Sequence, residues 1–268
     1  MLDLSIVIVS FNARADLERC LESLHTPAPS VPHEIIVVDN ASNDGSVQAA
    51  RQWPGVRVIE MNENVGFARA TNAGIRASTG LNLLWLNGDT IAPGDAVDRL
   101  LAELERRPEV AVVGPRLVDG RGRAELSFGP MIGPFAELRQ QILTRGHALG
   151  FRAISRFVER ATRRERAPDW VSGACLLVRR VDAEAVGLLD ERFFMYAEDV
   201  DFCAAVRARG RGILFTPAVE IVHRRGRSAA AAPAVTRDGY RRSKIAFYEK
   251  HHPAWVPLLR LYQRLFPG

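Results

Sequence analysis

Hydrophobic and polar positions follow two alternating patterns over residues 1–115 of the chain. Short apolar runs rich in β-branched residues predict buried strands at residues 5–10, 34–39, 56–60, 82–86 and 110–114. Between these runs, apolar side chains recur at helical spacing, first at Leu17, Cys20, Leu21 and Leu24, and later at Val97, Leu100, Leu101 and Leu104. Residues 67–79 also predict a helix. Strands separated by helices are typical of an α/β fold, in which helices cover both faces of a mostly parallel central sheet.

The pattern loosens between residues 116 and 168, where Gly and Pro recur and arginines are frequent. Apolar residues within 142–158 predict one or two short amphipathic helices. Such a segment is either a solvated insertion that covers a site, or a surface that faces a membrane or an acceptor molecule. The sequence favours neither interpretation over the other.

Regular patterns return after residue 168. The apolar run at 170–179 predicts a strand, and two more strands are predicted at 212–215 and 219–223. A helix that ends near Arg209 is predicted between them. We therefore expect residues 1–228 to form one domain.

The last forty residues, 229–268, form a predicted linker and a helical tail. Residues 229–234 are almost all small, and the segment from Arg237 has a helical pattern. Near its end, apolar side chains alternate with Arg260 and Arg264. This composition suits a helix that contacts a membrane surface, and equally a helix that packs on the core or in a dimer.

Composition excludes several classes of protein. Apolar residues make up 47% of the chain and charged residues 25%, as in ordinary globular proteins. No apolar run is long enough to span a membrane, and Asp3 stands where a signal peptide has Lys or Arg. The three cysteines, Cys20, Cys175 and Cys203, form no CxxC pair, so neither a zinc site nor a disulfide framework is expected. We expect reduced thiols and a cytoplasmic protein.

The net charge of +5 suits anionic substrates, anionic lipid surfaces or nucleic acid. Nearly all of the basic residues are arginines, whose forked guanidinium groups suit phosphate recognition. The arginine-rich segment lacks interleaved aromatic residues and any nucleic-acid recognition motif, so we expect no nucleic-acid partner.

Polar residues follow several of the predicted strands, where ligands bind in parallel sheets. Asp89 ends the run Asn87-Gly88-Asp89, which suits either a divalent ion held against a diphosphate or a plain turn. Asp39 suits hydrogen bonding to a ribose hydroxyl or a base, or else helix capping. Residues 64–74 open a helix whose N–H groups could bind an anion, with Arg69 one turn in. Asn72 and Gly74 in this helix also suit simple packing against the sheet.

A second acidic cluster, Glu198-Asp199-Val200-Asp201, begins a predicted helix after the aromatic segment 193–196. An apolar wall raises the pKa of a carboxylate base, whereas a helix dipole alone would also explain acids at this position. His223 ends the last predicted strand and is either a metal ligand or a surface histidine.

Together these pieces resemble the family 2 inverting glycosyltransferases of the GT-A fold, especially the bacterial rhamnosyltransferase-like branch. The resemblance spans residues 3–228. It rests on the segments 5–12, 37–42, 64–72, 86–89, 173–180 and 194–202, and on Val222-His223. The family fold is mostly parallel α/β. On this resemblance, residues 1–115 are the nucleotide-binding half, 116–168 a variable basic insertion, and 169–228 the acceptor and catalytic half.

The resemblance implies a role for each matching residue. Ser10, Asn12 and Asp39 would contact the nucleotide, Arg69 its phosphates, and Asn87 and Asp89 the sugar nucleotide. Asp89 and His223 would hold Mn²⁺ or Mg²⁺, although Asn87 replaces the usual first Asp of this motif. Asp199 would be the general base, and Trp170, Gly173 and Glu198 would face the acceptor.

The implied activity is transfer of a sugar from a nucleotide-diphosphate donor to a hydroxyl of a cell-surface glycan or lipid-linked acceptor. The branch favours L-rhamnose from dTDP-rhamnose, with a UDP-hexose or UDP-galactofuranose as alternatives. A non-catalytic subunit that binds sugar nucleotides or glycans is the alternative from another class. A sugar-1-phosphate nucleotidylyltransferase is disfavoured because no Gly-rich loop follows the first predicted strand. The resemblance also suits peripheral contact with the inner face of the plasma membrane, and it predicts no oligomeric state.

Overall fold

The computed structural model describes residues 2–224 and 233–265, so most of the predicted linker at 229–234 lies outside the described residues. The first half of the chain comprises β1 Leu4–Ser10, α1 Arg14–His25, β2 His33–Asp39, α2 Ser46–Ala50, β3 Val56–Glu60, α3 Phe67–Arg76, β4 Asn82–Asn87, β5 Thr90–Ile91, α4 Ala96–Glu105 and β6 Val110–Val118. The second half comprises β7 Phe128–Gly129, α5 Pro134–Ala148, α6 Arg152–Thr162, β8 Trp170–Val171, β9 Cys175–Arg179, α7 Arg180–Ala185, α8 Glu198–Ala208, β10 Gly212–His223, α10 Pro233–His251, the 3₁₀ turn η1 Pro253–Trp255 and α11 Val256–Leu265.

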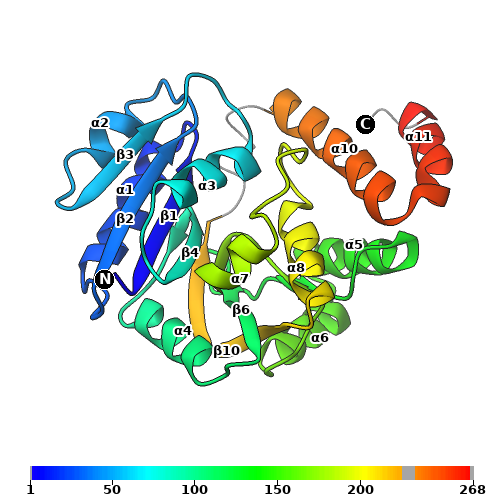
Figure 1. Ribbon diagram of the computed structural model, residues 1–268. Coiled ribbons are helices and arrows are strands. Elements are labelled where there is room, and N and C mark those ends of the chain that lie inside the picture. Colours follow the sequence, from blue (N-terminus) through cyan, green and yellow to red (C-terminus); the bar gives the residue numbers. More distant parts are fainter. Residues whose placement is uncertain (1, 225–232, 266–268) are drawn as a thin grey trace.

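The main sheet has the strand order β3-β2-β1-β4-β9-β6-β10-β5, with helices on both faces (Figure 1). Neighbours β3, β2, β1 and β4 run parallel, as do β6 and β10. The mostly parallel α/β fold is therefore confirmed. However, β9 is antiparallel to both β4 and β6 and separates them.

Two hydrophobic cores lie on opposite faces of this sheet because successive strand residues point to opposite sides. In β1, Ile6 and Ile8 belong to the core under α1 and α4. Val7 belongs to the other core, with Trp85 and Phe202 of α8, whose rings meet edge to face at 4.7 Å. The four apolar residues predicted for each of the helices α1 and α4 are all buried.

Two strand predictions were wrong in detail. The predicted strand at 170–179 is two strands, and the first of them, β8, pairs with β7 in a separate small sheet. Strands predicted at 212–215 and 219–223 are one strand, β10, whose register shifts between Thr216 and Glu220. Pro217 lies at this shift and has no N–H to donate to a neighbouring strand, which explains the break in the sequence pattern.

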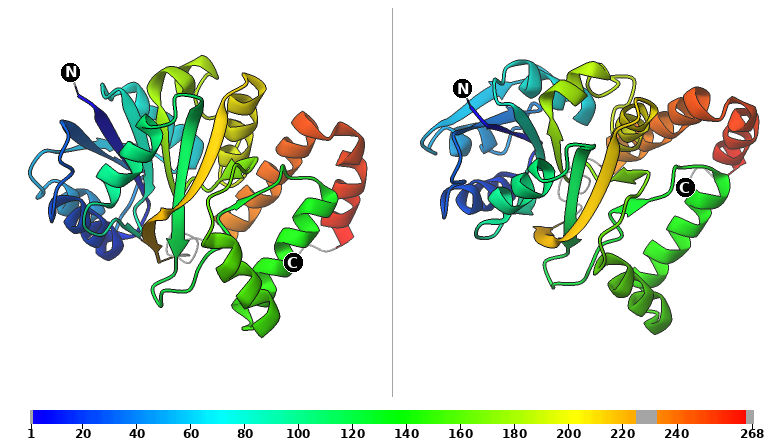
Figure 2. Two further views of the ribbon diagram at one scale, coloured as in Figure 1. Left: turned by 90° about the horizontal axis from the view of Figure 1, so that it is seen from below. Right: turned by 60° about the horizontal axis from the view of Figure 1, so that its bottom comes forward.

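The C-terminal helices pack on the domain beside α5 and α8 (Figures 1 and 2). Phe247 and Tyr248 of α10 and Val256 and Leu259 of α11 form a third core with Phe193. The outer face of α11 leaves apolar side chains exposed, namely Leu258, Leu261, Tyr262 and Leu265. Among the described residues, no helix is both long enough and apolar enough to cross a membrane.

Candidate active site

A cleft of about 500 Å³ opens at the carboxyl ends of β1 and β4. It brings together seven of the predicted site residues: Asn87, Asp89, Trp170, Gly173, Glu198, Asp199 and His223. Four others, Ser10, Asn12, Asp39 and Arg69, do not line it.

Ser10 and Asp39 end adjacent strands and are register partners. Both are 2% exposed. One oxygen of Asp39, Oδ2, accepts a hydrogen bond from the N–H of Ser42 at 2.8 Å. Within the described part of the chain, the Ser10 hydroxyl and the other Asp39 oxygen, Oδ1, have no hydrogen-bond partner. Buried polar atoms are seldom left unpaired, so this strand end suits a ligand that brings its own hydrogen-bonding groups.

Asn12 stabilises the loops beside this strand end. Its backbone, at φ 47°, is in the left-handed region, which Asn tolerates better than most residues. Its N–H donates to the Ser42 hydroxyl at 2.9 Å, and its side-chain oxygen accepts from the N–H of Asn43 at 2.8 Å. Asn12 therefore ties the loops after β1 and β2 together.

The start of α3 is not an open anion site, contrary to the sequence prediction. Phe67 donates its N–H to the Phe194 carbonyl at 2.7 Å, and the N–H groups of Val65 and Gly66 are bound by the side chains of Asn40 and Asn64. Asn40 and Asn64 also bind one another at 2.8 Å and line the cleft, a pairing that the sequence pattern gave no means to foresee. These hydrogen bonds join the loop before α3 to the segment that precedes Glu198.

Arg69 lies on the exposed side of α3, where its Nε is 3.4 Å from Glu191 Oε2. Asn72 donates to the Leu189 carbonyl at 2.8 Å and accepts from the Leu189 N–H. A Cβ on Gly74 would lie 2.4 Å from Cγ1 of Val7, so only glycine allows α3 to pack this closely on β1. Asn72 and Gly74 are accordingly packing residues.

In the cleft, His223 lies between two carboxylates. Its Nε2 is 3.4 Å from Asp89 Oδ1, and its Nδ1 is 3.1 Å from Glu125 Oε2. Burial would lower the pKa of His223, but the hydrogen bonds and charges of Asp89 and Glu125 outweigh it and raise the pKa to about 9. The site therefore favours a positive charge between the two carboxylates.

The donor set of Asp89 and His223, one carboxylate and one imidazole, suits a divalent ion such as Mn²⁺. Within the described ranges, no group of three or more His, Cys, Asp or Glu side chains could hold a metal ion. A nucleoside diphosphate would complete the coordination, as is usual for ions bound to substrate phosphates. Glu125, which sequence reasoning missed, would orient the imidazole from behind.

Asp199, which lines the same cleft, is held by two backbone N–H groups. Oδ2 accepts from Gly173 and Oδ1 from Val200, both at 2.8 Å. Burial raises the pKa of Asp199, although these hydrogen bonds partly oppose the shift. For the neighbouring Glu198, burial and then the charge of Asp199 raise the pKa well above the usual range. Both carboxyl groups therefore keep a proton to higher pH than ordinary acids do, and the shift is the larger one for Glu198.

The backbone that leads to this pair is strained. Tyr196 and Ala197 have φ values of 69° and 70°, in the left-handed region that non-glycine residues rarely adopt. Strain of this kind costs on the order of 1–3 kcal/mol per residue and persists where the surroundings enforce it. Here the contact of Phe67 with Phe194 fixes the segment just before the strained residues.

Comparison with known proteins identifies the chain. Residues 5–180 match the sequence model of the family described as Glycosyl transferase family 2. The chain belongs to this family. A relative from Mycobacterium tuberculosis, N-acetylglucosaminyl-diphospho-decaprenol L-rhamnosyltransferase, is 30% identical to this glycosyltransferase over 94% of the chain and 86% of the relative.

More distant relatives agree with this assignment. The low-salt glycan biosynthesis hexosyltransferase of Haloferax volcanii is 26% identical, over 82% of this family 2 glycosyltransferase and 67% of the relative. A mannosyltransferase from Pyrobaculum calidifontis, solved with GDP-Man and Mn²⁺, has the same fold with a TM-score of 0.62. It is 18% identical, and the match covers 97% of this chain and 70% of that one. The chain is thus a glycosyltransferase with the GT-A fold and is of the rhamnosyltransferase type.

Proposed function

We propose that the protein transfers L-rhamnose from dTDP-rhamnose, with inversion, to a hydroxyl of a lipid-linked sugar acceptor. The observation that carries the proposal is that one cleft is lined both by the Asp89–His223 pair and by Asp199. The 30% identity to a rhamnosyltransferase supports rhamnose as the sugar and a sugar-diphospho-polyprenol as the acceptor.

The reaction needs a base because an acceptor hydroxyl is a weak nucleophile. Asp199 would take the hydroxyl proton as the oxygen bonds to C1 of the donor sugar. The bond between C1 and the diphosphate breaks, and its electron pair leaves with the nucleoside diphosphate. One such displacement inverts the anomeric carbon and requires no covalent enzyme intermediate. Each Asp199 oxygen accepts one backbone hydrogen bond and keeps a further lone pair for this proton.

The leaving diphosphate gathers negative charge, which must be stabilised in the transition state. Asp89 and His223 would hold the divalent ion, and Mn²⁺ or Mg²⁺ supplies charge neutralisation of the diphosphate when bound. Ser10 and Asp39 would bind the nucleotide through their unpaired oxygens. Arg69, which pairs with Glu191, would have to turn toward the donor phosphates to contribute.

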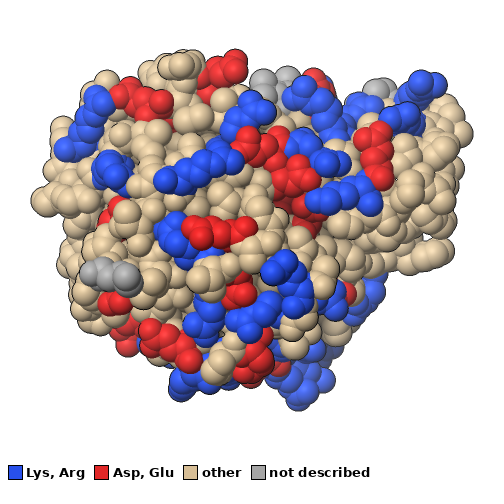
Figure 3. Space-filling view, viewed as in Figure 1, with Lys and Arg blue, Asp and Glu red and all other residues tan. Residues whose placement is uncertain are grey.

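The acceptor proposal includes peripheral contact with an anionic lipid surface. Apolar side chains are exposed on α5, α6 and α11 and just before α6, namely Phe135, Ile142, Phe151, Phe157, Leu258, Leu261, Tyr262 and Leu265. The same helices carry exposed arginines, among them Arg139, Arg152, Arg156, Arg260 and Arg264. In Figure 3, Lys and Arg gather at the lower right over α6, while the right-hand edge over α11 is largely uncharged. Apolar residues flanked by arginines are typical of helices that lie in the membrane interface.

A triple substitution on α11 tests the membrane contact, namely Leu258→Ser, Leu261→Ser and Leu265→Ser. It removes exposed apolar side chains but keeps the buried Val256 and Leu259. We expect weaker sedimentation with phosphatidylglycerol vesicles, and little binding of either protein to phosphatidylcholine vesicles. Equal binding of the variant and the unaltered protein to anionic vesicles would exclude α11 as the contact.

A donor panel tests the activity itself. Purified protein with Mn²⁺ is mixed with dTDP-rhamnose, UDP-glucose, UDP-galactofuranose or GDP-mannose, and both thermal stabilisation and nucleoside-diphosphate release are measured. We expect selective stabilisation by dTDP-rhamnose, release only when N-acetylglucosaminyl-diphospho-farnesol is present, and loss of both with EDTA. Selective response to a UDP-sugar would reassign the donor, and binding of a donor without turnover would favour a non-catalytic binding protein.

A further inference from the structure

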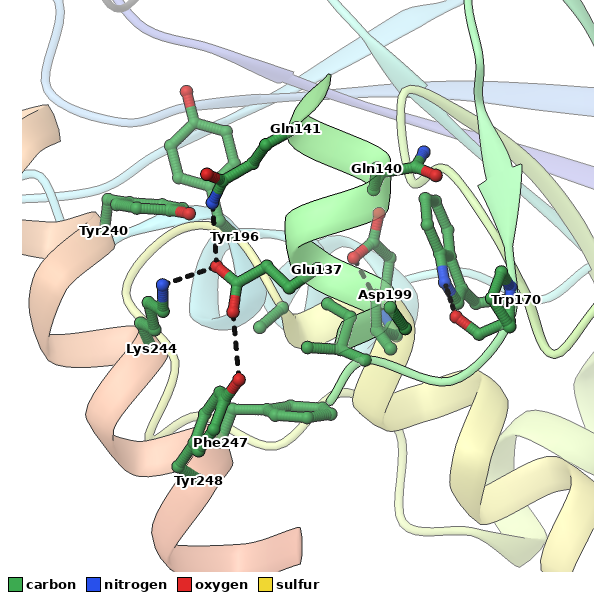
Figure 4. Close-up of a pocket in the computed structure, with 15 residues that line it drawn as sticks. Glu137, Gln140, Gln141, Trp170, Tyr196, Asp199, Tyr240, Lys244, Phe247 and Tyr248 are labelled. Carbon is green, nitrogen blue, oxygen red and sulfur yellow. Dashed lines mark hydrogen bonds and ion pairs between the residues drawn. The ribbon is translucent and has the colours of Figure 1, made fainter. Parts of the chain in front are cut away.

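A second pocket, of about 310 Å³, lies beside the cleft and shares Trp170, Tyr196 and Asp199 with it. Its remaining walls come chiefly from α5 and α10, which face each other across the pocket (Figure 4). Its volume is at the lower end of the range of about 300–1,000 Å³ that is typical of small-molecule sites. Asp199 therefore borders two hollows, and only one of them contains Asp89 and His223.

The walls of this pocket are mostly aromatic. Trp170, Tyr196, Tyr240, Phe247 and Tyr248 all line it, and the amide side chains of Gln140 and Gln141 project from α5. Aromatic rings present large, rigid apolar faces, and a few polar groups among them fix the orientation of a ligand. A sugar ring has this dual character, since its C–H faces are apolar and its rim carries hydroxyls.

The one carboxylate in the pocket besides Asp199 is already neutralised. Glu137 forms an ion pair with Lys244 at 2.5 Å and accepts hydrogen bonds from the Tyr248 hydroxyl at 3.0 Å and from Gln141 at 3.2 Å (Figure 4). Burial and then the charge of Glu137 raise the pKa of Tyr248 above its usual range, so its hydroxyl stays a donor. These contacts join α5 to α10 and set the width of the pocket. They neutralise Glu137, and the remaining carboxylate of the lining is Asp199, so the pocket suits an uncharged ring better than a diphosphate.

The position of α10 is coupled to the segment that carries the base. Ser243 accepts a hydrogen bond from the N–H of Met195 at 3.3 Å, and Lys250 pairs with Asp201 of α8 at 2.8 Å. A Cβ on Gly239 would lie 2.6 Å from Cδ1 of Phe194, so α10 and this segment are in close contact. The helix that forms the pocket wall is thus packed against the residues that precede Asp199.

We propose that this pocket holds the terminal sugar ring of the acceptor between its aromatic side chains, with the attacking hydroxyl at Asp199, and that α10 is an acceptor-recognition helix. The inference rests on the proposed function, in which Asp199 is the base. The donor diphosphate then occupies the other hollow, where Asp89 and His223 lie. The acceptor and the donor sugar meet at Asp199, which both hollows share.

The test fills the pocket. Ala136 lines it from α5, and Ala136→Trp would occupy part of its volume. Ala148→Trp is the matched control, because Ala148 is exposed at the far end of the same helix, about 18 Å away at 1.5 Å per residue. We expect Ala136→Trp to raise KM for N-acetylglucosaminyl-diphospho-farnesol on the order of tenfold or more, with KM for dTDP-rhamnose unchanged. The control is expected to leave both constants unchanged.

Direct binding separates this inference from the proposed function. Saturation-transfer NMR on the N-acetyl methyl group of the same probe, with dTDP present, reports contact without requiring transfer. We expect a signal with the unaltered protein and the control, and its loss with Ala136→Trp. Should Ala136→Trp fail to fold, Tyr240→Ala takes its place, since Tyr240 is 40% exposed and meets Tyr196 edge to face at 5.3 Å. An equal signal in the filled variant, or a raised KM for the donor instead, would overturn the acceptor assignment. Transfer failing while the pocket-dependent signal persists would contradict the proposed function alone.

Discussion

The N–H of Gly173 donates a hydrogen bond to Oδ2 of Asp199 over 2.8 Å, and a Cβ at position 173 would lie 3.3 Å from the Cβ of Asp199. The glycine joins β8 to β9, whereas the aspartate begins α8. This contact fixes the carboxylate at the wall of the cleft. Since the proposed reaction needs a positioned base, this contact makes Asp199 the first residue to test.

Asp199→Asn is expected to lower kcat by about 10²–10⁴, because the amide cannot take the proton of the acceptor hydroxyl. Donor binding, measured as thermal stabilisation by dTDP-rhamnose with Mn²⁺, is expected to persist because the residues proposed to bind the donor, Asp89 and His223 among them, are unchanged. Asp95→Asn is the control, since its side chain is 70% exposed on the surface near Arg99. A fully active Asp199→Asn enzyme would mean that another group is the base.

The rate is expected to fall in acid at a higher pH than for an ordinary aspartate. Asp199 acts in its ionised form, and burial raises its pKa, so the active fraction is lost as the pH falls through that raised value. Glu198→Gln is expected to keep this acid limb, because Asp199 remains and burial, the main cause of its raised pKa, is unchanged. The pH profile of kcat with saturating substrates measures both. Disappearance of the limb in Glu198→Gln would assign it to Glu198.

Glu125→Gln is expected to weaken Mn²⁺ binding about 10–100-fold, the usual effect of losing a carboxylate that orients a metal-bound histidine. Calorimetric titration of Mn²⁺ in the presence of dTDP measures this without turnover. Glu220→Gln serves as the control, because Glu220 lies on β10 three residues before His223 but is half-exposed and paired with Arg116. Unchanged affinity in Glu125→Gln would show that His223 needs no such support.

Gly66→Ala is expected to destabilise the fold by about 2–4 kcal/mol, because a Cβ would lie 2.3 Å from the Phe194 carbonyl oxygen at a φ of +86°. Gly55→Ala measures the cost of the left-handed backbone alone, since Gly55 has a φ of +73° and no atom lies within 4 Å of the position of an added Cβ. That control is expected to cost only about 1 kcal/mol. Urea unfolding gives both values. Equal losses would mean that the approach to Phe194 does not constrain the loop.

The local pattern predicted the elements of the first half well. The predicted run at 56–60 has the same bounds as β3. The predicted bounds of β1, β2 and β4 each differ by one residue at one end. The antiparallel position of β9 between β4 and β6 could not be predicted from the sequence, because periodicity identifies a strand but not its neighbours. The break at Pro217 likewise looked like a strand end, although both parts continue in one strand.

Site residues that belong to a sequence motif could be predicted. Residues that join the site only through contacts with distant parts of the chain could not. Asp89 lies just after β4, Asp199 in the first turn of α8 and His223 at the end of β10, and all three could be matched to a family. Glu125 meets His223 across 98 residues of chain and is one acid in a basic segment, so no local signal marked it. In the segment 64–74, predicted to open a helix with free N–H groups, the N–H of Phe67 is bound by the carbonyl of Phe194, which is distant in sequence and left no local signal.

The stereochemistry of the product tests the central claim most directly. The transferred sugar's anomeric configuration is read by NMR from the one-bond C–H coupling at C1 of the product, and compared with that of the donor. A single displacement with Asp199 as base predicts inversion at C1. Retention would contradict it, since retention requires either two displacements or an attack from the side of the leaving group.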